Sequence, residues 1–200
     1  MTSQYGDLLA RVSSLEKDNI EYKERVSTLE NKLELLDKHA CGSTIEIRNI
    51  PKQINKSKQV ITKIVKDIGL ALNLEAPIQD AEVRDIHRSK SEAIVVEFTC
   101  VSKKESIVAG YKKLNKDRRE NKEQQLNTTQ INLPEPPRVI YISEFLTLKA
   151  RHLFYIARES VKNKKLLAAW TSYGKVLVKK EEGATPVRID EEEDLFKLVI

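Results

Sequence analysis

Hydrophobic residues recur at alternating steps of three and four through the first forty positions of the chain. This spacing places them in one stripe of a helix and, sustained over several heptads, is typical of a coiled coil. We therefore expect residues 1–42 to form a coiled coil. Its seam consists of Tyr5, Val12, Asn19, Val26 and Leu33 at heptad position a, and of Leu8, Leu15, Tyr22, Leu29 and Leu36 at position d.

Charged residues beside the seam support this register. In a parallel coil, a residue at position g meets the residue at position e, five places later, on a neighbouring helix. All four such pairs combine opposite charges, which favours a parallel, in-register homo-oligomer, whereas an antiparallel coil loses this pattern. The pairs are Arg11 with Glu16, Asp18 with Lys23, Arg25 with Glu30, and Lys32 with Asp37.

Further seam features bear on the number of helices in the oligomer. Valine at a with leucine at d, together with Asn19, favours a dimer. Two hexads, Arg11-Val-Ser-Ser-Leu-Glu16 and Arg25-Val-Ser-Thr-Leu-Glu30, resemble the motif of short trimeric coiled coils, where the arginine packs over the core and pairs with glutamate of the next helix. We favour a homotrimer, with a dimer as the alternative. A single amphipathic helix packed on its own domain fits poorly, because the seam is narrow.

Residues 43–133 alternate between strand-like and helix-like patterns. Ser57 is a candidate N-cap for the first helix of this region. The order strand–helix–strand–strand–helix–strand is that of a split βαβ sandwich. The predicted strands are Ile45–Ile50, Ala81–Arg88, Ala93–Phe98 and Leu126–Leu133, and the predicted helices follow Ser57 to Leu72 and span Ser102–Lys116.

A stiff proline-rich segment, Pro134–Pro137, predicts a boundary, after which residues 134–200 form a small α/β domain with a three-stranded sheet. Thr147 is a candidate N-cap for a helix that runs to about Asn163. We interpret Trp170 as a core residue. The whole chain is thus predicted to be α+β. The other predicted elements are strands at Val139–Ile142, Ala168–Ser172, Lys175–Lys180 and Pro186–Ile189, and a short acidic helix at Glu191–Leu198.

The charge distribution changes this picture more than the composition does. The 200 residues are 40% hydrophobic and 32% charged, with a net charge of +5. Residues 138–180 carry 10 basic and 2 acidic side chains, whereas residues 181–200 carry 2 basic and 7 acidic ones. This asymmetry favours a polyanionic partner, most simply nucleic acid.

The basic residues of the predicted helix after Thr147 lie at helical spacing. Steps of 4, 3, 4 and 3 place four cations and one tyrosine on one face, a pattern in which cations bind phosphates and tyrosine stacks on a base. A solvated helix face is the alternative interpretation. The candidate nucleic-acid-binding residues are Arg151, Tyr155, Arg158, Lys162 and Lys165, extended by Lys175, Lys179 and Lys180 on the hairpin and by Arg118 and Arg119 before the linker.

Several classes of protein are excluded by missing motifs. The patterns GxGxxG, GxxxxGK and GxSxG are absent. Cys41 and Cys100 are far apart, and no histidine has a second ligand nearby, so we expect no metal, cofactor or catalytic activity. No segment approaches the ~18 apolar residues of a membrane span. The acidic run Asp190–Asp194 fits the first turn of a helix, and we also consider that it shields the basic face.

The middle region resembles an RNA-recognition-motif domain. Ile45-Glu-Ile-Arg-Asn-Ile50 has the outline of that family's signature in the first strand, and Ser91–Phe98 occupies the position of its third strand. The usual stacking aromatics are replaced by Glu46, Ala93 and Val95, which argues against base stacking on this sheet. A scaffold or protein-interaction domain of the same fold is the alternative.

The chain as a whole resembles two related groups in its layout. One is the nucleic-acid chaperone of LINE-type retrotransposons, and the closer one is the baculovirus few-polyhedra (FP) protein family with its insect relatives. The resemblance rests on Tyr141-Ile-Ser-Glu-Phe-Leu-Thr, Leu153-Phe-Tyr-Ile-Ala-Arg-Glu159, Gly174-Lys-Val-Leu-Val-Lys-Lys180 and Val187-Arg-Ile-Asp-Glu-Glu-Glu-Asp-Leu195. It implies a non-catalytic role in virion envelopment and occlusion into polyhedra.

Two functions are therefore expected. The first is an oligomeric, largely sequence-independent binder of single-stranded nucleic acid with chaperone-like activity, in which several weak sites on one stalk gain avidity. The second is a structural adaptor of the virion or occlusion body that binds capsid or envelope proteins. We expect an intracellular protein of the host cytoplasm, the nucleus or both, and the resemblance adds association with the virion as an option.

Overall fold

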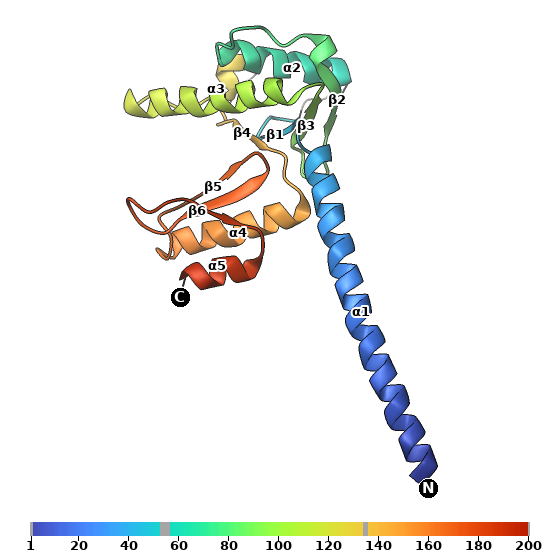
Figure 1. Ribbon diagram of the computed structural model, residues 1–200. Helices are drawn as coiled ribbons and strands as arrows, with labels where there is room; N and C mark the ends of the chain where they lie inside the picture. Colours follow the sequence, from blue (N-terminus) through green and yellow to red (C-terminus); the bar gives the residue numbers. More distant parts are fainter. Residues whose placement is uncertain (1, 53–56, 134–135, 200) are drawn as a thin grey trace. The chain divides into compact units, whose positions relative to one another are not determined.

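The computed structural model describes residues 2–52, 57–133 and 136–199 (Figure 1). The chain divides into two compact units, Met1–His39 and Ala40–Ile200. The second unit contains two sheets, each with a hydrophobic core of its own. The predicted α+β class is confirmed by this mixture of helices and sheets.

The helix α1 (Thr2–Ala40) accounts for the first unit. Its heptad seam is open to solvent in the single chain, where the apolar seam side chains are 50% to 68% exposed. An ion pair between Arg25 and Glu21 at 4.0 Å and another between Lys38 and Glu34 at 3.4 Å follow the helix surface. A single helix has no second surface against which to bury such a stripe, so these apolar side chains are left open along its length.

A four-stranded antiparallel sheet with strand order β2-β3-β1-β4 forms the first half of the second unit. The order of elements along the chain is strand–helix–strand–strand–helix–strand, with the fourth strand outside the region 43–133 for which this order was predicted. The elements are β1 (Thr44–Arg48), α2 (Lys58–Ala71), the 3-10 turn η1 (Asp80–Glu82), β2 (Val83–Arg88), β3 (Ile94–Phe98), α3 (Val101–Glu120), the 3-10 turn η2 (Thr128–Ile131) and β4 (Tyr141–Glu144).

The helices α2 and α3 contribute to one core with the sheet. Ile45, Ile47 and Phe98 are completely buried in this core, to which α2 adds Ile61, Ile64, Val65 and Ile68. The predicted cap is confirmed, because the Ser57 side chain accepts a hydrogen bond from the Val60 backbone at 3.4 Å. Gly69 permits a close approach, since a Cβ atom there would lie 2.8 Å from the Ile78 side chain.

The prediction of a strand at Leu126–Leu133 is wrong. This segment forms η2, because Asn127 accepts from the Thr129 backbone at 3.1 Å and a left-handed residue, Asn132, ends the turn. Leu126 and Ile131 are still buried in the core of the four-stranded sheet, but the turn and not a strand places them there. The expected strand near 139–142 supplies β4 instead, which pairs with β1.

The second half of this unit is a three-stranded sheet packed against a helix. The predicted three-stranded sheet is confirmed, with order β5-β6-β7. Thr147 caps the helix as expected, accepting from the Ala150 backbone at 3.1 Å. The elements are α4 (Leu148–Lys162), β5 (Ala168–Ser172), β6 (Lys175–Lys179), β7 (Val187–Ile189) and α5 (Glu192–Val199).

The two faces of this sheet differ sharply. Val176, Val178 and Ile189 point toward α4 and are buried with its Leu153 and Ala157. Because side chains alternate along a strand, their neighbours point the other way. We call this side the outer sheet face; its strand positions are Ala168, Trp170, Ser172, Lys175, Leu177, Lys179 and Arg188.

The interpretation of Trp170 as a core residue is therefore wrong. Among the described residues, neither core cluster includes it. Trp170 pairs in register with Leu177, which places both side chains on the outer sheet face, where each is half-buried. The pattern of apolar residues identified the hairpin but not the side on which its largest side chain lies.

The turn of this hairpin contacts the four-stranded half. Lys104 of α3 lies 5.8 Å from the centre of the Tyr173 ring, and it forms an ion pair with Glu144 of β4. The Gly174 backbone donates to the other oxygen of Glu144 at 3.4 Å. Three elements thus meet at one carboxylate, and this contact holds the two sheets against each other.

Candidate nucleic-acid interface

A cleft of about 830 Å³ lies between α4 and the face of the four-stranded sheet opposite to its core. We call it the α4 cleft. Its helical wall is formed by Arg151, Phe154, Tyr155, Arg158, Glu159 and Lys162, and its other wall by Glu46, Arg48, Lys52, Glu92, Ala93, Arg138, Ser143 and Glu144 with their neighbours.

The helical wall contains most of the predicted stripe. Arg151, Tyr155, Arg158 and Lys162 line the same cleft, because steps of 4, 3 and 4 return to one face of a helix. Tyr155 is 63% exposed, so much of this residue is accessible to a ligand in the cleft. The Arg151 guanidinium lies 5.4 Å from the centre of the Phe145 ring, which holds the arginine against an aromatic surface.

Carboxylates in the α4 cleft are neutralised by lysine or arginine. Glu46 pairs with Arg48 at 2.7 Å, and Glu92 pairs with Lys52 at 2.7 Å. In the same way, Glu159 pairs with Lys162 and Glu144 with Lys104.

Three arginines of the cleft remain uncompensated. Within the described ranges, no carboxylate pairs with Arg138, Arg151 or Arg158. Their three positive charges give the cleft a field that attracts anions.

The sheet wall lacks a platform for base stacking. Glu46 stands in register with Val95 on one side and Ser143 on the other, at the centre of this face. Its side chain is only 6% exposed and accepts a hydrogen bond from Arg48. Tyr155 and Phe154, both from α4, are the aromatic residues that line the cleft in the described structure, so any stacking takes place on the helical wall.

The other predicted residues lie outside the α4 cleft. Lys165 follows the end of α4 and Lys164, whose φ of 58° takes the chain out of the helix. The stripe therefore ends at Lys162, and the expectation that Lys165 continues it is wrong. Lys175 and Lys179 lie on the outer sheet face, and Lys180 follows directly after β6.

Arg118 and Arg119 occupy the last turn of α3 and do not line the cleft. The Arg118 side chain is partly buried and donates to the Gln124 carbonyl at 3.0 Å. This bond fixes the chain after α3, so Arg118 has a structural role here.

Arg48, Lys52 and Arg138 are cleft residues that the sequence interpretation missed. Arg48 carried a usable signal, because it lies two positions after Glu46 in a strand and therefore on the same face. Lys52 and Arg138 lie in irregular segments, where spacing indicates no direction for a side chain.

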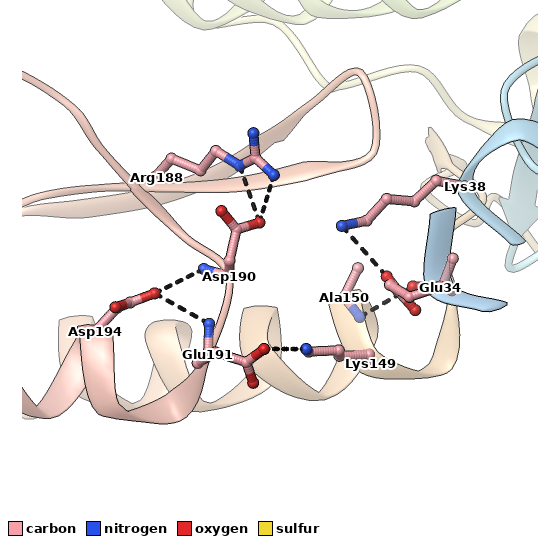
Figure 2. Close-up of polar contacts among 9 residues, drawn as sticks. Glu34, Lys38, Lys149, Ala150, Arg188, Asp190, Glu191 and Asp194 are labelled. Atoms are coloured by element: carbon pink, nitrogen blue, oxygen red, sulfur yellow. Dashed lines mark hydrogen bonds and ion pairs between the residues drawn. The ribbon is translucent and has the colours of Figure 1, made fainter. Parts of the chain in front are cut away.

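Acidic residues at the end of the chain form the start of α5, as expected (Figure 2). One Asp194 oxygen accepts from the backbone N–H groups of Asp190 and Glu191, both at 3.1 Å. These backbone hydrogen bonds hold the pKa of Asp194 below its ordinary value. Nearby, the Arg188 guanidinium donates to Asp190 at 2.6 and 2.9 Å.

The idea that this acidic segment shields the basic stripe does not fit the contacts. Glu191 pairs with Lys149, as Figure 2 shows, and Glu192 with His152 at 2.8 Å. Both partners lie on α4 but outside the α4 cleft. The acidic residues therefore fasten α5 to the flank of α4 and leave Arg151 and Arg158 open.

The part of the chain that the structure describes contains neither a metal-binding cluster nor a membrane-spanning helix. No three His, Cys, Asp or Glu side chains gather there as a metal-binding group would. No helix in it combines the length and apolar character needed to cross a membrane.

Comparison with known protein families gives a match over part of the chain. Residues 147–199 match the family described as Baculovirus FP protein domain 2. The match begins at the N-cap of α4 and ends with α5, so it spans the helix and sheet of the second core. This supports the expected relation to the baculovirus FP family. No curated protein matches the chain.

Proposed function

We propose that the protein is a non-catalytic, FP-type binder of single-stranded nucleic acid and that the strand lies in the α4 cleft. The observation that carries this proposal is the set of uncompensated arginines beside an exposed tyrosine. Arg138, Arg151 and Arg158 bind phosphates, and Tyr155 stacks on a base. Backbone contacts of this kind are largely independent of sequence.

The preference for a single strand follows from Tyr155. In a duplex the faces of the bases are stacked on one another and offer no surface to a side chain. In a single strand every base has a free face, and stacking on an aromatic ring contributes about 1–3 kcal/mol per base. The protein therefore discriminates against duplexes at this residue.

Oligomerisation through α1 is the second part of the proposal. The open apolar seam and the opposite charges beside it support a parallel homotrimer, with a dimer as the alternative. Several cleft-bearing units on one stalk bind one strand with avidity. Repeated weak contacts that exchange quickly also suit a chaperone-like role.

The relation to the FP family supports a role in envelopment and occlusion of virions within the infected cell, in the cytoplasm or nucleus. Nucleic acid held by the α4 cleft would link this protein to the packaged genome or to viral transcripts. The resemblance to retrotransposon chaperones stays a prediction from the layout of the chain.

Fluorescence anisotropy with a labelled single-stranded oligonucleotide tests the proposal. We expect the variant Arg151→Ala/Arg158→Ala to bind about 25-fold more weakly at 0.1 M salt, because two phosphate contacts are lost. A matched control, Lys63→Ala/Lys112→Ala, removes the same charge from exposed positions of α2 and α3 and leaves binding nearly unchanged. Both variants keep the oligomeric mass of the parent.

Equal weakening by both variants would mean that net charge, and not the α4 cleft, governs binding. Absence of binding by the parent, together with nuclease-resistant capture of capsid or envelope proteins, would replace the proposal with the structural adaptor.

A further inference from the structure

The outer sheet face combines an aromatic side chain with cations. Trp170, Leu177 and Arg188 stand side by side across the three strands, since Leu177 pairs in register with both of the others. Lys175 and Lys179 lie before and after Leu177 on the same strand and face, roughly 13 Å apart for four residues of strand. The pattern is an apolar pair, Trp170 and Leu177, beside Arg188, with a lysine on β6 before and after Leu177.

The charges on this face have one sign. None of its strand positions is acidic. Arg188 is paired with Asp190, but Lys175 and Lys179 have no carboxylate partner among the residues that the structure describes. Among helices, α4 packs against β5 and β6 from the opposite side and α5 packs against β7. A surface with this charge complements a polyanion and repels other basic surfaces.

The α4 cleft and the outer sheet face meet at one strand. β5 lies at the edge of its sheet, and Thr171 of β5 lines the α4 cleft. Its neighbours Trp170 and Ser172 point to the other face, because side chains alternate along a strand. A polymer that leaves the cleft beside Thr171 therefore has to cross only the edge of β5 to reach Trp170.

We propose that the outer sheet face is a second contact surface for single-stranded nucleic acid, on which Trp170 stacks a base while Lys175 and Lys179 bind phosphates, and which a strand reaches from the α4 cleft over the edge of β5. The inference rests on the proposed function and extends it. It gives a role to the hairpin lysines, which lie on the far side of the sheet from the cleft. It also explains why the chain places its largest side chain outside both cores.

Trp170 reports on this surface directly, because the chain contains one tryptophan. The test titrates the full-length protein with single-stranded oligothymidine of about 20 nucleotides, a length that exceeds one compact site. Tryptophan emission and the anisotropy of a labelled copy are followed in parallel. We expect emission to be quenched as binding saturates, since a stacked base quenches indole fluorescence.

Two pairs of variants separate stacking from charge. Trp170→Leu should weaken binding between about 5-fold and about 150-fold, the range for one stacked base, whereas Trp170→Phe retains a ring and loses less. Lys175→Ala/Lys179→Ala should weaken both binding and quenching, whereas the matched control Lys63→Ala/Lys112→Ala leaves both unchanged.

The outcomes distinguish this inference from the proposed function. Saturable anisotropy with constant tryptophan emission, and with parental affinity for Trp170→Leu and Lys175→Ala/Lys179→Ala, overturns the second surface and leaves the α4 cleft standing. Parental affinity of Arg151→Ala/Arg158→Ala, with quenching retained, overturns the cleft and supports the outer sheet face. No anisotropy change with the parent protein overturns both.

Discussion

The Lys104 ammonium lies 2.7 Å from an oxygen of Glu144, and the two side chains are 3% and 4% exposed. One belongs to α3 and the other to β4, while the hairpin turn of the second sheet covers both. Burial alone lowers the pKa of Lys104, but hydrogen bonds to Glu105 and Glu144 outweigh burial and leave this pKa above its ordinary value. Lys104 is therefore charged throughout the physiological range.

Removal of one partner of this pair should be costly. In Lys104→Met, the Glu144 carboxylate stays buried with the long contact from Gly174 as its remaining partner in the described structure. We expect the free energy of unfolding to fall by about 3 kcal/mol, the usual cost of an uncompensated buried charge. Urea denaturation followed by circular dichroism measures this loss.

The double variant Lys104→Met/Glu144→Leu supplies the control. With both charges removed, stability should return to within about 1 kcal/mol of the parent, because well-packed apolar residues often replace a buried pair without loss. If the double variant instead loses as much stability as Lys104→Met and Glu144→Leu lose when their separate effects are added, the two residues are not energetically coupled.

Salt dependence checks the nature of the contacts in the α4 cleft. If each protomer neutralises about five phosphates, the logarithm of the binding constant falls with the logarithm of salt concentration with a slope of about −3.5. Arg151→Ala/Arg158→Ala should reduce the slope to about −2.1, since each lost contact removes about 0.7. A slope unaffected by the two substitutions would place the phosphates elsewhere.

The proposed oligomerisation through the seam of α1 can be tested by substituting charged residues into the seam. Leu15→Asp/Leu29→Asp puts two carboxylates at d positions, where a neighbouring helix excludes water, and should convert the oligomer into a monomer. Sedimentation equilibrium measures the mass. Ser14→Asp/Asn31→Asp adds the same charge outside the seam and should leave the mass unchanged.

The same experiment tests avidity. The monomeric variant should lose affinity for a long single strand much more than for an oligonucleotide that fills a single cleft. Retention of full affinity for the long strand would mean that one protomer accounts for all of the binding.

Acid should weaken the start of α5. The pKa of Asp194 is lowered by the backbone hydrogen bonds that its carboxylate accepts, so this carboxylate is more acidic in the folded state than in the unfolded state. Its contribution to stability is complete above the ordinary aspartate pKa of about 3.9 and is lost as pH falls through the lower folded value. The parent should therefore melt at a higher temperature than Asp194→Ala at pH 7, and this difference should shrink below about pH 3.9. A constant difference across this range would contradict the role of the carboxylate.

Periodicity and capping residues were sufficient to predict most regular elements. Ser57 and Thr147 act as caps where expected, and the hairpin turns at Tyr173-Gly174 between β5 and β6. Patterns failed where polar residues and not apolar ones decided the structure. Asn127 turned an apparent strand into η2 and left the fourth position in the sheet to Tyr141–Glu144.

The site was predicted as far as it lies on one helix. Arg151, Tyr155, Arg158 and Lys162 could be grouped because α4 fixes their relative directions. The opposite wall depends on packing between segments far apart in the sequence, which no local pattern contains. Lys104 illustrates the limit, since within a charged helix it has the sequence environment of a solvated lysine, yet it lies in the contact between the two sheets.

Only residues 145–147 join β4 to α4, and the Phe145 backbone still donates to β1 at 3.1 Å. Because this connection is short, it limits how far α4 can lie from the four-stranded sheet. A fragment cut at Thr147, where the FP match starts, would keep its own interior but leave behind the strand that sets its orientation. Truncated variants should for this reason keep the four-stranded sheet together with α4 and the three-stranded sheet. Insertion or deletion of residues at 145–147 would change the width of the α4 cleft.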